Sequence, residues 1–237
     1  MRSPVQLAST ICLGLFITVV ATGLAQRGAA SQATSPGSPS DATARIVASA
    51  QALLTTLDDA GRAKVQFPFE GPQKTRWSNL PSPMFQREGL RLGDVTPAQR
   101  ASVMSLLATA LSRDGYRKIN DIMRGDEVLR TAAEGRSGAA GGGQGRGGAR
   151  GGGGVRFGED EYYLAFLGTP SVTAPWMLQF GGHHLAINLT MAGNQSSMAP
   201  SLPAAQPATY TFEGRTVRPL GNENDKAFAL INALNDA

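Results

Sequence analysis

The residues best suited to chemistry in this chain are two adjacent histidines, His183 and His184, which directly follow Gly181 and Gly182. They are the only two histidines of the sequence. Imidazole is the commonest metal ligand and the usual acid or base at neutral pH. Neighbouring glycines let a ligand or another backbone segment approach closely. We therefore predict that His183 and His184 are catalytic residues or metal ligands.

Three consecutive carboxylates, Glu159, Asp160 and Glu161, come just before a predicted strand and are candidates for a third metal ligand. Two histidines with one carboxylate make up many catalytic zinc and non-haem iron sites. We therefore predict a divalent metal such as zinc, held by His183, His184 and Glu161, although the spacing matches no established metal-binding motif. The alternative is that the three carboxylates form a solvated loop of like charges.

The histidines also have a structural interpretation, in which their ring nitrogens bond to backbone carbonyls near a hairpin turn. Adjacent side chains of a regular strand point to opposite faces. The two rings can therefore share a ligand only where the backbone bends at Gly181 and Gly182. We expect one ring to face a site and the other to be buried and hydrogen-bonded. Asn188, on the same predicted strand face as His184, is a candidate to orient that ring.

Two further function classes stay open. A metal-free hydrolase would pair a histidine with a nucleophile such as Ser171, which follows Pro170 in a predicted turn but lacks a Gly-x-Ser-x-Gly elbow. A non-catalytic module would bind a small-molecule or cell-envelope ligand on aromatic side chains, for which Trp77 and Trp176 are candidates. Burial of these tryptophans in the core is the alternative.

The charge balance argues against a nucleic-acid partner. The chain has 22 Lys and Arg residues and 18 Asp and Glu residues. One basic residue lies in positions 1–25 and three lie in a Gly-rich tract at 135–154, so the rest of the chain carries equal numbers of the two signs. No basic surface for nucleic acid or an anionic membrane is predicted. The tract has the composition of a disordered loop, and an RNA-binding Arg-Gly segment is the alternative.

The N-terminus has the layout of a secretory signal peptide at 1–25. Arg2 gives a short positive region, residues 7–24 carry no charge, and small residues precede the expected cleavage before Gln26. The apolar stretch is short for a membrane-spanning helix of about 20 residues, so we expect no membrane anchor after cleavage. The only cysteine, Cys12, would be lost with the signal. The mature protein is then expected to be periplasmic or secreted.

We predict one α+β domain at 42–237, preceded by a disordered spacer at 26–41 and interrupted by a disordered loop at 135–154. Amphipathic helices come first and alternating strands follow, which indicates N-terminal helices packed on a small, mainly antiparallel sheet. Thr96 and Gln99 form an expected capping box. Residues 58–61 either end the first helix or start a short second one. Helices are expected at 43–57, 96–115, 116–129 and 226–234, and strands at 162–167, 176–180, 184–190, 209–212 and 216–218.

Several short, distinct motifs are distributed along the predicted domain. They are Trp77 with Leu80-Pro81, Arg87-Glu88-Gly89-Leu90, Gln99-Arg100, Leu111-Ser112 with Gly115-Tyr116, Tyr162-Tyr163, Gly168-Thr169-Pro170-Ser171, Pro175-Trp176, Gln179, and Gly182-His183-His184-Leu185 with Asn188. Together they resemble the DUF3500 family, a domain of unknown function found in exported bacterial proteins and some eukaryotic ones. The resemblance spans residues 46–220 and is most specific at 176–188. It implies no particular activity. It also implies that the Gly-rich tract is an insertion in a loop and that family sequences extend beyond this chain.

Overall fold

The structure is a computed structural model that describes residues 41–139 and 155–234. All of these belong to one unit that spans 36–237. The predicted signal peptide, the predicted spacer up to residue 40 and the tract at 140–154 lie outside the described residues. Among the helices of the described part, none is long and apolar enough to cross a membrane.

The helix predicted at 43–57 ends at Thr55, and a second, short helix follows it. Helix α1 (Asp41–Thr55) buries one apolar face, which includes Ala50 and Leu53. Helix α2 (Asp59–Val65) starts where the Asp58 side chain accepts a hydrogen bond of 2.8 Å from the Gly61 amide. Such an N-cap satisfies an amide at the helix start that has no partner within the helix. Of the two alternatives for residues 58–61, the short second helix is therefore confirmed.

The next two helices confirm the capping box and correct one boundary. Helix α3 (Pro97–Ala110) begins with Thr96 and Gln99 bonded reciprocally, as predicted. Gly115, which was predicted to end the preceding helix, lies in the first turn of helix α4 (Arg113–Ala139). The Ser112 hydroxyl accepts a hydrogen bond from the Gly115 amide and so caps the start of α4. The helix also runs ten residues past the predicted end at 129, so positions 135–139 of the predicted disordered loop are helical.

The unit contains a six-stranded sheet whose four longer strands come from its second half, and the predicted α+β class is confirmed. Its central strands are antiparallel, and only the first strand pairs in parallel. The strand order is β1-β3-β4-β5-β6, with β2 paired to β3. The strand at the edge of the sheet, Gln195–Pro203, was not predicted from the sequence, because it is polar and contains prolines. The strands are β1 (Gln66–Phe67), β2 (Leu90–Arg91), β3 (Tyr163–Leu167), β4 (Trp176–Gly181), β5 (Leu185–Ala192) and β6 (Gln195–Pro203).

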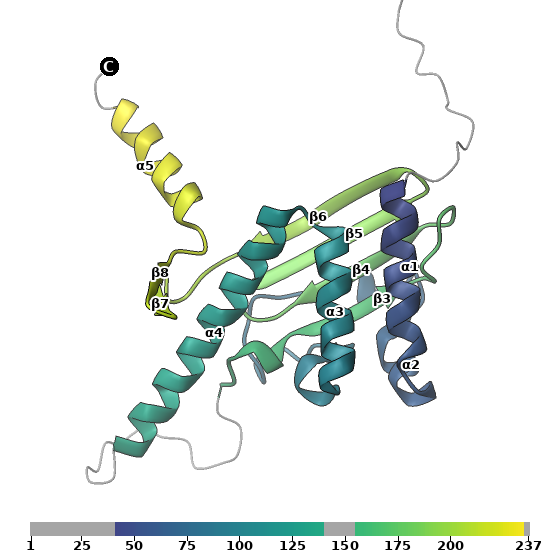
Figure 1. The fold of residues 1–237 in the computed structure, drawn as a ribbon, viewed down its shortest axis with the longest axis horizontal. Coiled ribbons are helices and arrows are strands. Elements are labelled where there is room, and N and C mark those ends of the chain that lie inside the picture. The colour runs from purple at the N-terminus through teal and green to yellow at the C-terminus, as the bar shows by residue number, and fades with distance from the viewer. Residues whose placement is uncertain (1–40, 140–154, 235–237) are drawn as a thin grey trace, which may run out of the picture. The chain divides into compact units, whose positions relative to one another are not determined.

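Both faces of the central strands are buried, with different partners. Helices α1, α3 and α4 cover one face, as Figure 1 shows, and the main core lies between them and the sheet. On β3 the side chains alternate, so Leu164 and Phe166 enter this core while Ala165 and Leu167 face the other way. The second face is covered by the irregular segment at 68–88 and its neighbours, and Phe69 packs against it. That segment therefore packs on the core, as expected from its large apolar side chains.

A separate hairpin and a final helix follow. Strands β7 (Tyr210–Phe212) and β8 (Arg215–Val217) pair around a turn with Gly214 at a positive φ of 72°. The Tyr210 hydroxyl donates to the backbone carbonyl of Asp121 at 2.7 Å and so attaches the hairpin to α4. Helix α5 (Gly221–Leu234) starts five residues before the predicted position and has no buried residue.

Candidate functional site

The two histidines form the turn between β4 and β5. Gly181 pairs with Ala186 as the last rung of the ladder, and the Gly182 amide donates to the carbonyl of Leu185 at 2.9 Å. His184 therefore precedes its strand, where a strand residue was predicted. Because a turn lacks the alternation of a strand, the two rings lie side by side, with centroids 3.9 Å apart.

His184 is held by a buried carboxylate. Its Nδ1 bonds to Oδ1 of Asp126 on α4, whose side chain is only 1 % exposed. The other carboxylate oxygen accepts a hydrogen bond of 2.7 Å from the Tyr162 hydroxyl. Because a carboxylate accepts hydrogen bonds, Nδ1 of His184 carries the proton and Nε2 keeps its lone pair in the neutral ring. Burial, reinforced by the charge of Asp126, raises the pKa of Tyr162 well above its ordinary value, so the hydroxyl remains a donor.

His183 is half-buried and has a fixed tautomer as well. Its Nδ1 bonds to the backbone carbonyl of Asn79. A carbonyl can only accept, so Nδ1–H is the donor and Nε2 is an unprotonated base. Burial, together with the nearby His184, lowers the pKa of His183 below its ordinary value. The ring therefore stays neutral at pH 7, and its other neighbour is the ring of Phe157 at 5.4 Å between centroids.

Arg87 binds the backbone of the histidine turn. Its Nη2 donates to the carbonyl of Gly182 at 2.6 Å and to those of Ser78 and Leu80 at 2.7 and 2.8 Å. The segment at 78–80 also supplies the carbonyl that binds His183. The guanidinium and the imidazole thus connect the same loop to the turn, and both histidines are positioned by bonds on their Nδ1 side.

The predicted metal ligand Glu161 lies in a different set of contacts. Its Oε1 accepts from Nη2 of Arg91 at 2.7 Å and lies 3.6 Å from Nε of Arg156. Its neighbours Glu159 and Asp160 bind Arg100, so they are ion-paired rather than a purely solvated loop. Within 41–139 and 155–234, no group of three or more His, Cys, Asp or Glu side chains is placed to hold a metal ion.

The other candidates from the sequence make contacts elsewhere and do not bond to the two histidines. Trp176 is fully buried in the core, and its Nε1 donates to the backbone carbonyl of Ser171. The Ser171 hydroxyl accepts from the amides of a local turn. Trp77 is half-buried beside a cavity of about 40 Å³ between the 68–88 segment and the sheet. Asn188 bonds to the carbonyl of Pro200 on β6, not to His184.

Sequence reasoning missed the partner roles of Asp126, Tyr162 and Arg87. A signal for Asp126 was present, because it continues the inward stripe of α4 one turn after Ile122. A charged residue at a buried helical position needs partners, and here they are His184 and Tyr162. The resemblance motifs contained Tyr162 and Arg87, but spacing alone gave neither of them a role.

The chain is similar to one described protein family. Residues 40–237 match the model of a family described as a protein of unknown function, DUF3500. No curated protein and no solved structure shows a significant match to the chain.

Proposed function

Since this chain belongs to the DUF3500 family, whose function is unknown, we propose its activity from its own residues. The protein is an exported enzyme that uses His183 as a general base. The ring of His184, which is bonded to Asp126, lies next to this base. The observation that carries the proposal is the fixed tautomer of His183. Its Nδ1 is engaged by the carbonyl of Asn79, which leaves the basic Nε2 free on a half-buried ring. Hydrolysis is the simplest reaction of this kind.

In this proposal, Nε2 of His183 takes a proton from water or from a substrate hydroxyl, and the oxygen bonds to the carbonyl carbon or the phosphorus of an ester. The ester bond to the alcohol then breaks, and the imidazolium gives its proton to the departing alcohol oxygen. The base must be neutral before the step, and its lowered pKa favours that state at pH 7. The imidazolium that forms is stabilised by the charge of Asp126, which acts to raise the pKa of His183. The bond between Asp126 and His184 keeps the neighbouring ring in place during the transfer.

The metal-dependent form of the proposal has less support. It needs three converging ligands, and Glu161 is bound to Arg91 instead. The described residues contain no alternative group of three ligands. The metal-free form is therefore the one that the geometry favours.

The base can be tested without knowing the substrate, by carbethoxylation of the mature protein with diethyl pyrocarbonate, which modifies neutral, accessible imidazoles. We expect one rapid modification, at His183, because His184 is buried. The rate should fall on acidification with a midpoint below about 6.5, the ordinary histidine value, because burial lowers this pKa. Peptide mapping by mass spectrometry locates the adduct. An unreactive His183, or a midpoint above that value, would contradict the proposal.

Turnover is then measured on chromogenic carboxylic and phosphate esters. The variant His183→Ala should lose about 10²–10⁴-fold in kcat/KM, as expected when a general base is removed. The matched control is Ser171→Ala, which removes the other predicted nucleophilic group and should retain activity. Loss in the serine variant with retention in the histidine variant would replace the proposal with a serine hydrolase. If no ester is hydrolysed and His183 is unreactive, the acid–base function fails.

Export is part of the proposal, and it is supported by the uncharged stretch at 7–24 after Arg2. We expect the mature chain in the periplasmic or secreted fraction with Gln26 as its first residue. N-terminal sequencing of untagged protein from fractionated cells tests this. An intact Met1 in the cytoplasmic fraction contradicts it.

A further inference from the structure

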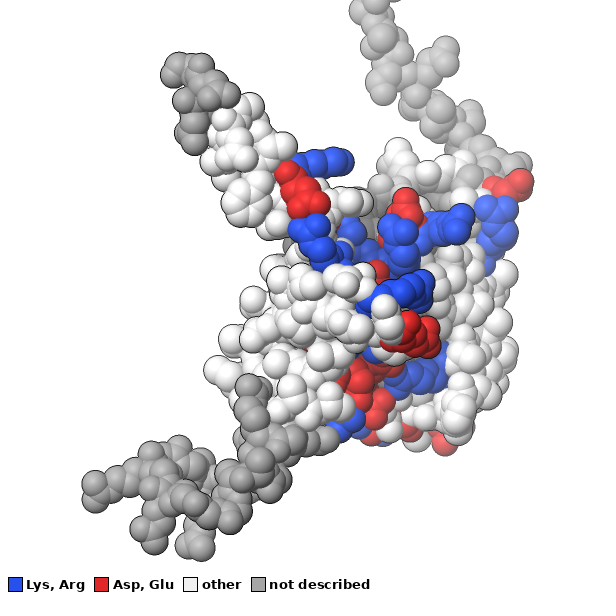
Figure 2. Space-filling view, turned by 60° about the vertical axis from the view of Figure 1, so that its left-hand side comes forward, with Lys and Arg blue, Asp and Glu red and all other residues white. Residues whose placement is uncertain are grey.

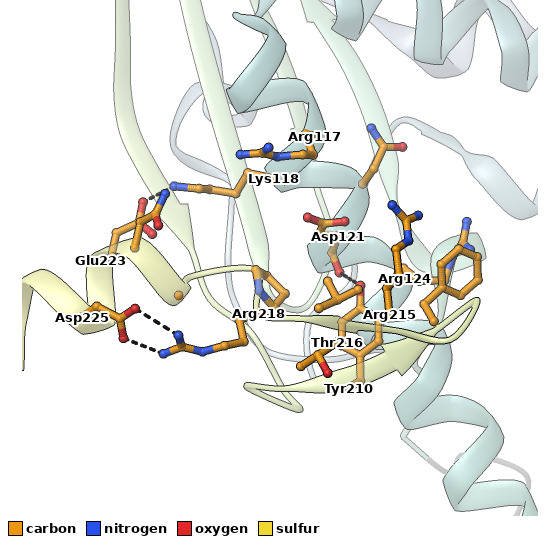
Figure 3. Close-up of a pocket in the computed structure, with 16 residues that line it drawn as sticks. Arg117, Lys118, Asp121, Arg124, Tyr210, Arg215, Thr216, Arg218, Glu223 and Asp225 are labelled. Carbon is orange, nitrogen blue, oxygen red and sulfur yellow. Dashed lines mark hydrogen bonds and ion pairs between the residues drawn. The ribbon is translucent and has the colours of Figure 1, made fainter.

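A second candidate site lies between α4, the β7–β8 hairpin and the start of α5, and Figure 3 shows it in close-up. The pocket has a volume of about 540 Å³, within the range of sites that hold small organic ligands. Side chains of α4 form one wall, and the hairpin attached through Tyr210 forms another. It contains none of the residues of the histidine site.

More basic than acidic side chains line the pocket, and each of the basic ones is ion-paired with a carboxylate of the lining or just outside it. Five basic side chains line it against three carboxylates. Figure 2 shows Lys and Arg side chains, interspersed with Asp and Glu, gathered at the base of α5 and over the face below it. This excess is local, because the basic and acidic residues outside the signal and the Gly-rich tract are equal in number. The basic lining residues are Arg117, Lys118, Arg124, Arg215 and Arg218.

Two of these guanidinium groups are only weakly engaged by protein carboxylates. Arg117 lies 3.3 Å from Asp114 and Arg215 lies 3.7 Å from Glu213. The side chains of Arg117 and Arg215 are 67 % and 77 % exposed, and exposed pairs of this kind contribute little free energy. These arginines can therefore turn toward an incoming oxyanion, for which the planar guanidinium offers two parallel donors.

The pocket is also lined by carboxylate, hydroxyl and aromatic side chains, which suit a ligand with hydroxyl groups and an apolar face. Asp121 points into the pocket between the basic residues (Figure 3), and burial raises the pKa of this carboxyl, although Arg117 and Arg124 act to lower it. Carboxylate and hydroxyl groups of Asp121 and Thr216 suit the hydroxyls of a polar ligand. The aromatic ring of Phe212, already stacked on Arg124 at 4.0 Å, offers an apolar surface for a sugar ring.

We propose that this pocket binds a hydroxylated organic anion, a sugar that carries a phosphate or carboxylate group. The arginines of α4 and β8 bind the oxyanion, and Asp121 and Thr216 accept or donate hydrogen bonds at the ring hydroxyls. Nothing in this assignment depends on the proposed acid–base function.

The test is isothermal titration calorimetry with three probes that share one ring: glucose 6-phosphate, glucuronate and glucose. The two anions should bind and glucose should not. The variant Arg117→Ser/Arg215→Ser, whose exposed side chains do not support the fold, should weaken binding about tenfold, as expected for the loss of two exposed charge contacts. The control Arg45→Ser/Lys64→Ser removes the same charge from exposed positions on α1 and α2 and should bind like the parent.

The outcomes separate the ligand classes. Tighter binding of glucose 6-phosphate assigns a phosphate ligand, and tighter binding of glucuronate assigns a carboxylate. Binding of neither anion, or equal weakening in the pocket variant and the control, overturns the site. Each of these results is independent of the reactivity of His183, so failure here leaves the acid–base proposal standing, and the reverse also holds.

Discussion

Replacing His184 with alanine is expected to lower the free energy of unfolding by about 3 kcal/mol, because removing one partner of a buried charged hydrogen bond costs about 3–5 kcal/mol. The substitution leaves the Asp126 carboxylate, 1 % exposed, with the Tyr162 hydroxyl as its remaining partner. A buried carboxylate with incomplete hydrogen bonding is destabilising. Urea unfolding followed by tryptophan fluorescence measures the change.

The matched control is His183→Ala. That ring is half-buried and bonds to a backbone carbonyl at the loop surface, so we expect a loss below about 1.5 kcal/mol. The double variant His184→Ala/Asp126→Asn should be less destabilised than the sum of its single variants, because the two residues share one interaction. Equal losses in the two histidine variants, or additive losses in the double variant, would show that the pair does not stabilise the fold.

Replacing Gly182 with alanine is expected to cost about 2–3 kcal/mol, as an added methyl group does where the packing cannot relax. A Cβ at this position would lie 2.8–2.9 Å from three atoms of the Tyr162 ring. That ring is fully buried and its hydroxyl is bonded to Asp126, so it cannot move aside cheaply. The turn must shift instead, and the same shift would displace His183 and His184.

Gly71→Ala is the control for this prediction. A Cβ there meets its nearest atom at 3.6 Å, and its φ of −177° is extended backbone that any residue adopts. Its stability should stay within about 0.5 kcal/mol of the parent. Thermal unfolding compares the two, and carbethoxylation reports whether the histidine turn has moved. A Gly182→Ala protein with parental stability and an unchanged His183 reaction rate would refute the close-packing argument.

The elements were predictable where one local pattern dominated. The capping box at Thr96 and the alternation of Leu185, Ile187 and Leu189 both follow from short-range rules, and both are found. The two-residue strands β1 and β2 had no such signal, because each depends on pairing with β3 far along the chain. The α+β class thus follows from local periodicity, while the edges of the sheet do not.

The site was predictable in its centre and not in its partners. The histidine pair was conspicuous by residue type, but 58 positions separate Asp126 from His184. Glu161 was a reasonable third ligand by sequence proximity. The pairing of Arg91 beside Tyr163 in the sheet places a guanidinium against Glu161 instead. Which acidic side chain meets a histidine and which meets an arginine is decided by strand pairing and helix packing, neither of which is local.

The polar last strand of the sheet has a consequence for behaviour at high concentration. Strand β6 is exposed along most of its length and carries Pro200 and Pro203, which offer no amide to a neighbouring strand. Pro200 also lies where the pairing with β5 shifts register, and Asn188 binds its carbonyl. At the other edge the strands are only two residues long. Because neither edge offers a long row of free backbone groups, the folded sheet is protected against edge-to-edge aggregation.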